Sequence, residues 1–366
     1  MLSNVSIRDG HDNFFTPLRI IFALMVVIGH SFAIGMHDIA AEPFLFFHYK
    51  PSYLAVNLFF IASGFLVTKS MLYRGDAAEY GSARLLRIYP ALIVHVLFVM
   101  FVMGPFVTNL PLKEFFTNPQ LLLQPFMVLS FVDTEMVMPG ALLTNDEQIA
   151  SAPLWTLRYE ILAYIGTLIA FSFGLMKRKW MLLAQFVVPA VLWIVIHFTG
   201  SFDELPATVQ SLLRFGLSYG LGAALYAYRD RITFNIIGIP IIGLVVSLFY
   251  GTASFEVAVN IWLAYILFWG AYVKIPSLNR LQSVSDISYG IYIYHWCLLQ
   301  WFAYKMPSLG MIQLMILTLI ATLIVSVLSW NLIEKPMLRH KTWFAKFLRF
   351  GRMKPREYNP AAMLAD

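Results

Sequence analysis

The segment Pro17–Ile34 reads PLRIIFALMVVIGHSFAI and is long and apolar enough to begin a transmembrane helix. It carries two ionisable residues, Arg19 near its start and His30 well inside it. In an α-helix these two residues lie within about 20° of the same face and roughly 16 Å apart along the axis. Ionisable groups at membrane depth are costly and usually face a cavity or a partner. The segment therefore predicts a membrane protein with a functional site at His30; the alternative is a histidine that bonds a backbone carbonyl of a neighbouring helix.

The composition of the whole chain agrees with a membrane protein. Of its 366 residues, 59% are hydrophobic and 13% are charged, whereas about 25% of the residues of a soluble domain are charged. The single cysteine, Cys297, excludes an internal disulfide and a cysteine-rich metal site. The sequence also lacks clustered metal-ligand spacings such as HExxH, so we expect no metal.

Ten apolar stretches of roughly spanning length predict an all-α integral membrane fold. They are Pro17–Gly35, Tyr53–Tyr73, Ile88–Thr108, Leu154–Met176, Met181–Thr199, Ala207–Tyr228, Ile232–Tyr250, Phe255–Val273, Ser288–Tyr304 and Met311–Ile333. If the amino terminus is cytoplasmic and the spans alternate, 21 of the 26 lysines and arginines fall on the inside. This bias predicts about ten transmembrane helices in the cytoplasmic (inner) membrane, with both termini cytoplasmic. It also explains the net charge of +6 as an orientation signal, so nucleic acid is excluded as a partner.

Two regions lie outside the predicted helix array. Residues 334–366 form a basic tail after the transmembrane domain of residues 1–333. Within this tail, Lys341–Arg356 mixes aromatic and basic residues, which predicts an amphipathic helix in contact with membrane lipids. The segment Pro105–Pro153 is predicted to lie on the outside. Its part from Asp133 to Ser151 is acidic without a basic residue, which suits a solvated loop or an entrance for a neutral hydroxylated substrate.

Glu160 lies roughly 9 Å below the outer end of its predicted span, which is the depth expected for His30. A carboxylate beside an imidazole fixes its tautomer and stabilises the imidazolium that forms when it accepts a proton. Glu160 is therefore predicted to orient His30 as a general base. The alternative is that Glu160 pairs with Arg158 or Arg214, since a buried charge needs a partner.

Arg84 and Arg87, in the sequence SARLLRIYP, lie three residues apart on one helix face at the cytoplasmic end of their span. With Arg19 they would form a cluster of three guanidinium groups, whose planar forks suit phosphate. The cluster predicts a binding site for an anionic cofactor at the inner surface. The alternative is that these arginines bind lipid phosphates and orient the span.

Two further features inside the predicted spans are not assigned to catalysis. His295, in SYGIYIYHW, is surrounded by tyrosines that offer hydrogen bonds, and we expect it to be structural or to line a cavity. Ser63 and Gly64, in NLFFIASGF, lie at mid-membrane, where small residues more often permit close helix packing than supply a nucleophile.

Taken together, these motifs resemble those of the membrane-bound acyltransferase-3 family. Four stretches carry the resemblance in the family's order: LRIIFALMVVIGHS, NLFFIASGFLVTKS followed by RLLRIYP, PLWTLRYEI, and ISYGIYIYHW leading to NLIEKP. The resemblance covers nearly the whole chain and implies about ten spans, a cytoplasmic acyl-CoA donor (usually acetyl-CoA) and O-acylation of a carbohydrate. It also implies that His30 is the essential histidine and that Arg19, Arg84 and Arg87 are the basic residues of the family's motifs.

The residues and the resemblance lead to one hypothesis. The phosphates of acyl-CoA would bind at the cytoplasmic mouth, and the thioester would reach His30, which takes the proton of an acceptor hydroxyl arriving from the outer side. The expected acceptor is a carbohydrate or a lipid-linked glycan. The sequence leaves open succinyl-CoA as donor, a small lipophilic acceptor, a homo-oligomer, and a proton-coupled secondary transporter or exporter that uses His30 and Glu160.

Overall fold

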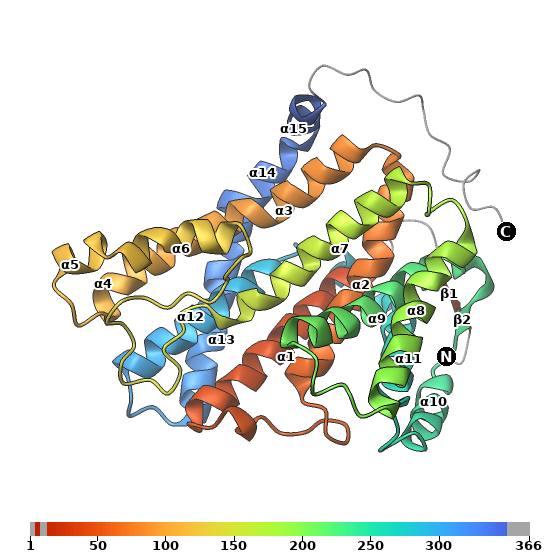
Figure 1. Cartoon of the computed structure of the whole chain (residues 1–366), viewed down its shortest axis with the longest axis horizontal. Helices are drawn as coiled ribbons and strands as arrows, with labels where there is room; N and C mark the ends of the chain where they lie inside the picture. The colour runs from red at the N-terminus through yellow and green to blue at the C-terminus, as the bar shows by residue number, and fades with distance from the viewer. Residues whose placement is uncertain (1–3, 8–12, 350–366) are drawn as a thin grey trace.

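The computed structural model describes residues 4–7 and 13–349, and almost all of their regular structure is helical (Figure 1). The long described helices are α1 (Phe15–Gly35), α2 (Pro51–Arg74), α3 (Ala77–Phe98), α7 (Trp155–Ser172), α8 (Lys179–Phe198), α9 (Ala207–Ala227), α11 (Phe255–Tyr272), α12 (Ser288–Lys305) and α13 (Met311–Ser329). Two short strands, β1 (Val5–Ser6) and β2 (Thr233–Phe234), pair antiparallel, with Val5 opposite Phe234.

Shorter helices continue or connect the long ones. They are α4 (Gly104–Val107), α5 (Leu112–Thr117), α6 (Pro119–Leu129), α10 (Gly238–Ser247), α14 (Lys335–Arg339) and α15 (Lys341–Leu348). One π-helical turn, Val99–Met103, joins α3 to α4, and another, Trp330–Glu334, joins α13 to α14. The resulting helical segment Met311–Arg339 runs without a break through residues 333 and 334, where the sequence predicts the tail to begin.

Seven of the described helical segments are long and apolar enough to cross a membrane, which confirms an all-α membrane fold. The predicted spans at α9 and α12 are long enough but are less apolar, and they are not among the seven. Helix α10 covers only 10 residues of the predicted stretch Ile232–Tyr250. At 1.5 Å per residue it extends about 15 Å, half of a hydrocarbon core of about 30 Å.

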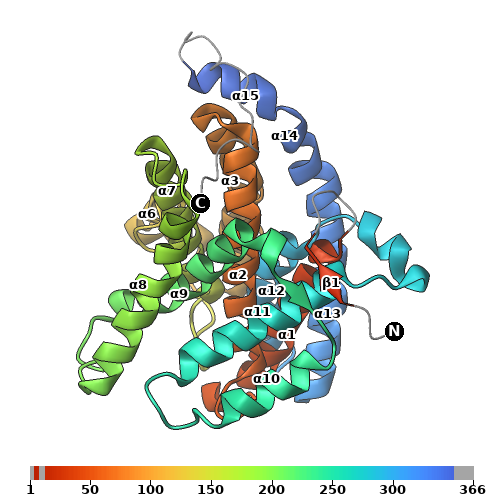
Figure 2. The same cartoon turned by 90° about the vertical axis from the view of Figure 1, so that its right-hand side faces the viewer.

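Helix α12 lies inside the bundle, where it packs against α1 and α13 and also contacts α3 and α4 (Figure 2). Every residue from Ser288 to Gln300 is buried. Because protein rather than lipid surrounds this helix, its side chains need not be apolar. This explains why α12 carries tyrosines and His295 and why its apolarity falls below that of the lipid-facing helices.

Glycines bring α2 and α9 into backbone contact. A Cβ atom on Gly64 would lie 2.0 Å from the carbonyl oxygen of Tyr219, and one on Gly222 would lie 2.0 Å from that of Ile61. No side chain therefore fits at these two positions unless the helices move apart. The structure confirms that Gly64 serves close helix packing, as the sequence predicts.

Helix α15 folds back onto the beginning of α3 (Figure 1). Arg349, just after α15, pairs with the carboxylates of Asp76 and Glu79 at 3.1 Å and 3.0 Å. Trp343 of α15 is 66% exposed, which suits a membrane surface. The remainder of the predicted tail helix, residues 350–356, lies outside the described residues, and anchoring of the tail to lipid stays a prediction.

Candidate active site

Two histidines from distant parts of the chain meet inside the bundle. Nδ1 of His30 on α1 lies 2.9 Å from Nε2 of His295 on α12. The two rings stack with 5.1 Å between their centroids, and the ring of Trp296 stands edge-on to His30 at 5.0 Å. His295, which the sequence suggests to be structural or to line a cavity, is thus the direct partner of the histidine predicted to be catalytic.

The hydrogen bonds of His295 determine which nitrogen of His30 is free. Nδ1 of His295 lies 2.8 Å from the carbonyl oxygen of Tyr292 and 3.1 Å from that of Ile291. A carbonyl oxygen only accepts, so Nδ1 of neutral His295 carries the proton and its Nε2 accepts from Nδ1–H of His30. The neutral pair therefore leaves a lone pair on Nε2 of His30, which has no hydrogen-bond partner among the described residues.

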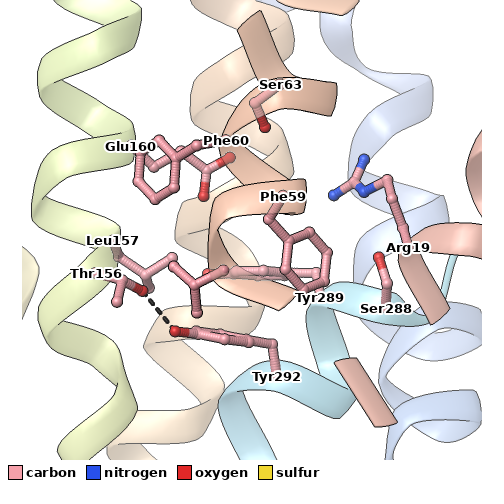
Figure 3. A pocket seen from close by; sticks show the side chains of 11 residues that line it. Arg19, Phe59, Phe60, Ser63, Thr156, Leu157, Glu160, Ser288, Tyr289 and Tyr292 are labelled. Carbon is pink, nitrogen blue, oxygen red and sulfur yellow. Dashed lines mark hydrogen bonds between the residues drawn. The ribbon is translucent and has the colours of Figure 1, made fainter. Parts of the chain in front are cut away.

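A narrow cavity lies between α1, α2, α7 and α12 (Figure 3). It has an empty volume of about 490 Å³, and aromatic side chains such as Phe59 and Tyr292 form much of its wall. Arg19 and Glu160 reach into it from opposite sides (Figure 3). Tyr292 precedes His295 by three residues, about 4.5 Å along α12, so this end of the narrow cavity lies one helical turn from the histidines.

The narrow cavity widens at its other end into a basic chamber. The chamber has an empty volume of about 1030 Å³ and shares Arg19, Ser63, Glu160 and Tyr289 with the narrow cavity. Its charged lining consists of five basic side chains and two carboxylates: Arg19, Arg74, Arg84, Arg87, Lys341, Glu160 and Asp286. The structure thus brings together the three arginines that the sequence predicts to form a cluster.

Asp286 ties two of these arginines together. Its Oδ2 lies 3.2 Å from Arg19 and 2.7 Å from Arg87, and Arg87 also pairs with Glu334 at 3.1 Å. Burial opposes ionisation of Asp286, but the two guanidinium groups and the hydrogen bonds from Ser288 outweigh it and lower the pKa of Asp286 to about 2. These carboxylates hold Arg19 and Arg87 in place and neutralise part of their charge.

Arg84 differs from these two arginines because no carboxylate of the described residues lies within ion-pairing distance of it. Its Nε is buried without a hydrogen-bond partner in that part of the chain, and its guanidinium carbon lies 5.5 Å from the ring centroid of Tyr164. Leaving a buried donor unpaired costs about 1–3 kcal/mol. A group of this kind in a cavity wall points to a ligand that completes its hydrogen bonds.

Glu160 lies in the wall shared by the chamber and the narrow cavity, and its carboxylate accepts a hydrogen bond from the hydroxyl of Tyr164. The sequence predicts that Glu160 orients His30, but the side chain that contacts His30 is His295 instead. The alternative ion pairs with Arg158 and Arg214 are absent from the described structure too, because both guanidinium groups donate to other oxygens.

Asp286 and Glu334 received no role from the sequence. Asp286 stands two residues before a tyrosine-rich helix, where its Oδ1 also accepts from the hydroxyl of Ser288 at 2.5 Å. The backbone N–H of Ser288 also donates to this Oδ1, at 3.3 Å, which makes an Asx turn. An Asp two residues before a Ser at the start of a helix was the available signal for a fixed carboxylate. Glu334 belongs to the second π-helical turn. Such turns occur frequently at functional sites, but sequence periodicity does not reveal them.

Comparison with known proteins identifies the class. Residues 13–331 match the model of an acyltransferase domain. The chain therefore belongs to the acyltransferase-3 family, as its motifs predict, and it is an acyltransferase whose catalytic domain contains several apolar helices of membrane-spanning length.

Two relatives cover nearly the full length of the chain. One is named O-acetyl transferase, from Shigella phage Sf6, and is 27% identical in an alignment 343 positions long, gaps included, that covers 89% of this chain and 96% of that protein. The other is nodulation protein 10 from Rhizobium leguminosarum bv. viciae, which is 27% identical in an alignment 365 positions long, gaps included, that covers 91% of this chain and 95% of that protein. No solved structure matches the chain significantly.

Proposed function

We propose that this protein is a membrane-bound O-acyltransferase that moves an acyl group, in the first place acetyl, from cytoplasmic acyl-CoA to a hydroxyl of a surface or lipid-linked carbohydrate. One observation carries the proposal. A basic chamber, in which the buried Nε of Arg84 has no hydrogen-bond partner among the described residues, continues as a narrow cavity to within one helical turn of the pair His30–His295. The name of the phage relative supports acetyl as the transferred group.

The basic chamber suits the phosphate-bearing end of the donor. Arg84 offers its guanidinium fork to a phosphate, and Arg74 and Lys341 add positive charge around it. The narrow cavity, lined by Phe59 and Tyr289, suits the long and weakly polar pantetheine arm. The thioester would then lie at the end of the narrow cavity, next to the histidine pair.

His30 acts as the general base in this proposal. Its Nε2 takes the proton of the acceptor hydroxyl while the hydroxyl oxygen attacks the thioester carbonyl carbon. The carbon–sulfur bond then breaks, and the thiolate takes the proton from His30 and leaves as free CoA. His295 is a positioning residue, because accepting from Nδ1–H of His30 keeps the reactive lone pair on Nε2. This route needs no covalent enzyme intermediate.

We also propose that the chain makes ten spans in the cytoplasmic (inner) membrane, with both termini cytoplasmic. The positive-inside bias supports this topology. The burial of α9 and α12 explains how both can be spans despite their lower apolarity. Helix α10 would cross only together with its flanking residues. In this topology the basic chamber opens toward the cytoplasm, where acyl-CoA is available.

The rival function is proton-coupled transport through the same histidines. Purified protein in detergent, incubated with acetyl-CoA and a surface polysaccharide, separates the two functions. We expect free CoA, detected with a thiol reagent, together with acetylated polysaccharide, detected by mass spectrometry. Uptake of saccharide into liposomes driven by a pH gradient, without thioester consumption, would establish transport instead. Parallel reactions with succinyl-CoA and with a small lipophilic alcohol test the alternative donor and acceptor.

A further inference from the structure

A second large cavity lies beyond the histidine pair, at the opposite ends of the same two helices. This outer cavity has an empty volume of about 1120 Å³ and is lined by the end of α1, residues 144–146, the end of α12 and the beginning of α13. Ile34 in its wall follows His30 by four residues, about 6 Å along α1. The histidine pair therefore lies between the narrow cavity on one side and the outer cavity on the other.

The outer cavity is lined by both hydrogen-bond donors and acceptors. Its polar side chains are His37, Thr144, Asn145, Asp146, Tyr304 and Lys305. Nδ1 of His37 lies 2.6 Å from Oδ2 of Asp146, and both side chains are largely exposed. A hydroxyl group both donates and accepts, so a ligand with many hydroxyl groups matches this lining. The basic chamber, in contrast, has the excess of positive charge that suits an anion.

The wall of the outer cavity is attached to the helix that carries His295. The side-chain amide of Asn145 donates to the carbonyl oxygen and to Oε1 of Gln300 on α12, at 3.0 Å and 2.6 Å. Nε1 of Trp296, the residue after His295, donates to the carbonyl oxygen of Ile149 at 2.7 Å. A ligand bound to this wall is consequently held at a defined position relative to the histidine pair.

An apolar partition separates the outer cavity from the histidines. It consists of Ile34, Trp296, Leu299 and Leu314, which form one buried cluster. Ile34 and Leu314 also line the outer cavity, and Trp296 contacts the ring of His30. An apolar layer at this position keeps bulk water from Nε2 of His30 until a hydroxyl of a bound ligand displaces it.

We infer that the outer cavity is the binding site of the acceptor, a hydroxyl-rich molecule of the carbohydrate class, and that donor and acceptor reach the histidine pair from opposite cavities. This inference rests on the proposed acyltransferase function. A third cavity, lined by residues of α2, α8 and α11 around Glu256, is also aromatic and polar. Neither His30 nor His295 belongs to those helices. The outer cavity, in contrast, is lined by the ends of the two helices that carry the histidines.

The first test measures acyl transfer by Asp146→Asn and Lys305→Gln at saturating acetyl-CoA and varied acceptor. The acceptor is an oligosaccharide preparation from surface polysaccharide of cells that lack the protein. We expect the KM for acceptor to rise about tenfold in each variant, because each substitution removes one hydrogen bond between the acceptor and a charged group. The KM for acetyl-CoA should stay unchanged. Asp133→Asn, in the same acidic segment but outside the cavity lining, is the matched control and should behave as wild type.

A second test does not depend on turnover. Cys297 is buried, so Thr144→Cys provides one accessible thiol in the outer cavity, and Thr252→Cys provides one in the third cavity. The oligosaccharide should slow maleimide labelling at position 144 and leave labelling at position 252 unchanged. Unchanged acceptor KM together with unprotected labelling at position 144, in protein that still consumes acetyl-CoA, would overturn this inference alone. If wild-type protein consumes no acyl-CoA at all, the proposed function fails and the inference fails with it.

Discussion

Nδ1 of His30 and Nε2 of His295 lie 2.9 Å apart, although 265 residues separate them along the chain. The contact requires α1 and α12 to pack side by side, and it joins the histidine expected to be catalytic to one held by backbone carbonyls. Those carbonyls decide the tautomer of both rings, so the backbone of α12 determines which nitrogen of His30 is basic. A neutral imidazole thus lies beside His30 in the position that carboxylates have beside the catalytic histidines of other enzymes.

His295→Leu removes the acceptor for Nδ1–H of His30 and should lower kcat about 10²-fold, because the ring loses its orientation and tautomer preference. His295→Gln should retain more activity, since its amide oxygen can accept the same hydrogen bond. The KM for acetyl-CoA should change little in both variants. Steady-state kinetics on purified protein checks this split. Equal loss in the two variants would assign His295 to packing only.

Arg84→Ala and Arg87→Ala should have different consequences. Arg84 has no carboxylate partner among the described residues, so its removal should raise the KM for acetyl-CoA with little effect on thermal stability. Removal of Arg87 leaves Asp286 and Glu334 without its charge, which should cost about 3–5 kcal/mol of stability and lower Tm. Donor kinetics and Tm on both variants test this. An unchanged donor KM in Arg84→Ala would assign this arginine to lipid contact.

Asp286→Asn should lower Tm at neutral pH, because Arg19 and Arg87 lose their shared carboxylate. The pKa of Asp286 is lowered to about 2 from about 3.9 in an unfolded chain. Its charge therefore adds stability that is complete above about pH 5 and is lost as the pH falls toward about 2. The difference in Tm between wild type and variant should be constant from pH 7 to pH 5 and shrink below pH 4. A difference that grows on acidification would contradict the ion pairs.

Glu160→Gln should keep kcat within a few-fold of wild type, because the carboxylate contacts Tyr164 rather than His30. The variant should bind acyl-CoA at least as tightly, since it removes a negative charge from a chamber for an anion. Determination of kcat and of the KM for acetyl-CoA distinguishes these effects. A large loss of kcat with normal donor binding would place Glu160 in the catalytic step, as predicted from its depth in the span.

The arginine cluster was predictable because it depends on local order along the chain. Arg84 and Arg87 share a helix face by their spacing, and the charge pattern brings them to the same membrane end as Arg19. The structure places all three in one chamber. Helix periodicity and the positive-inside bias determine a residue's depth in the membrane, and depth was sufficient for this cluster.

Depth alone was not sufficient for Glu160 and His295. Counting residues along a span gives the height of a side chain but not the direction it faces or the neighbouring helix. Glu160 was therefore assigned to His30, whereas the packing of α1 against α12 brings His295 to it instead. Apolarity likewise identifies helices that face lipid. It is a poor guide to α12, because protein surrounds this helix and its side chains need not be apolar.

The central claim is that His30 is the general base that activates the acceptor hydroxyl. The most direct measurement compares the kcat of acetyl transfer to saccharide for wild type and His30→Gln, with acetyl-CoA affinity measured on the same purified preparations. We predict a loss of about 10²–10⁴-fold in kcat, the usual contribution of general-base catalysis, with Tm and donor affinity close to wild type. Transfer by folded His30→Gln within a few-fold of wild type would contradict the account.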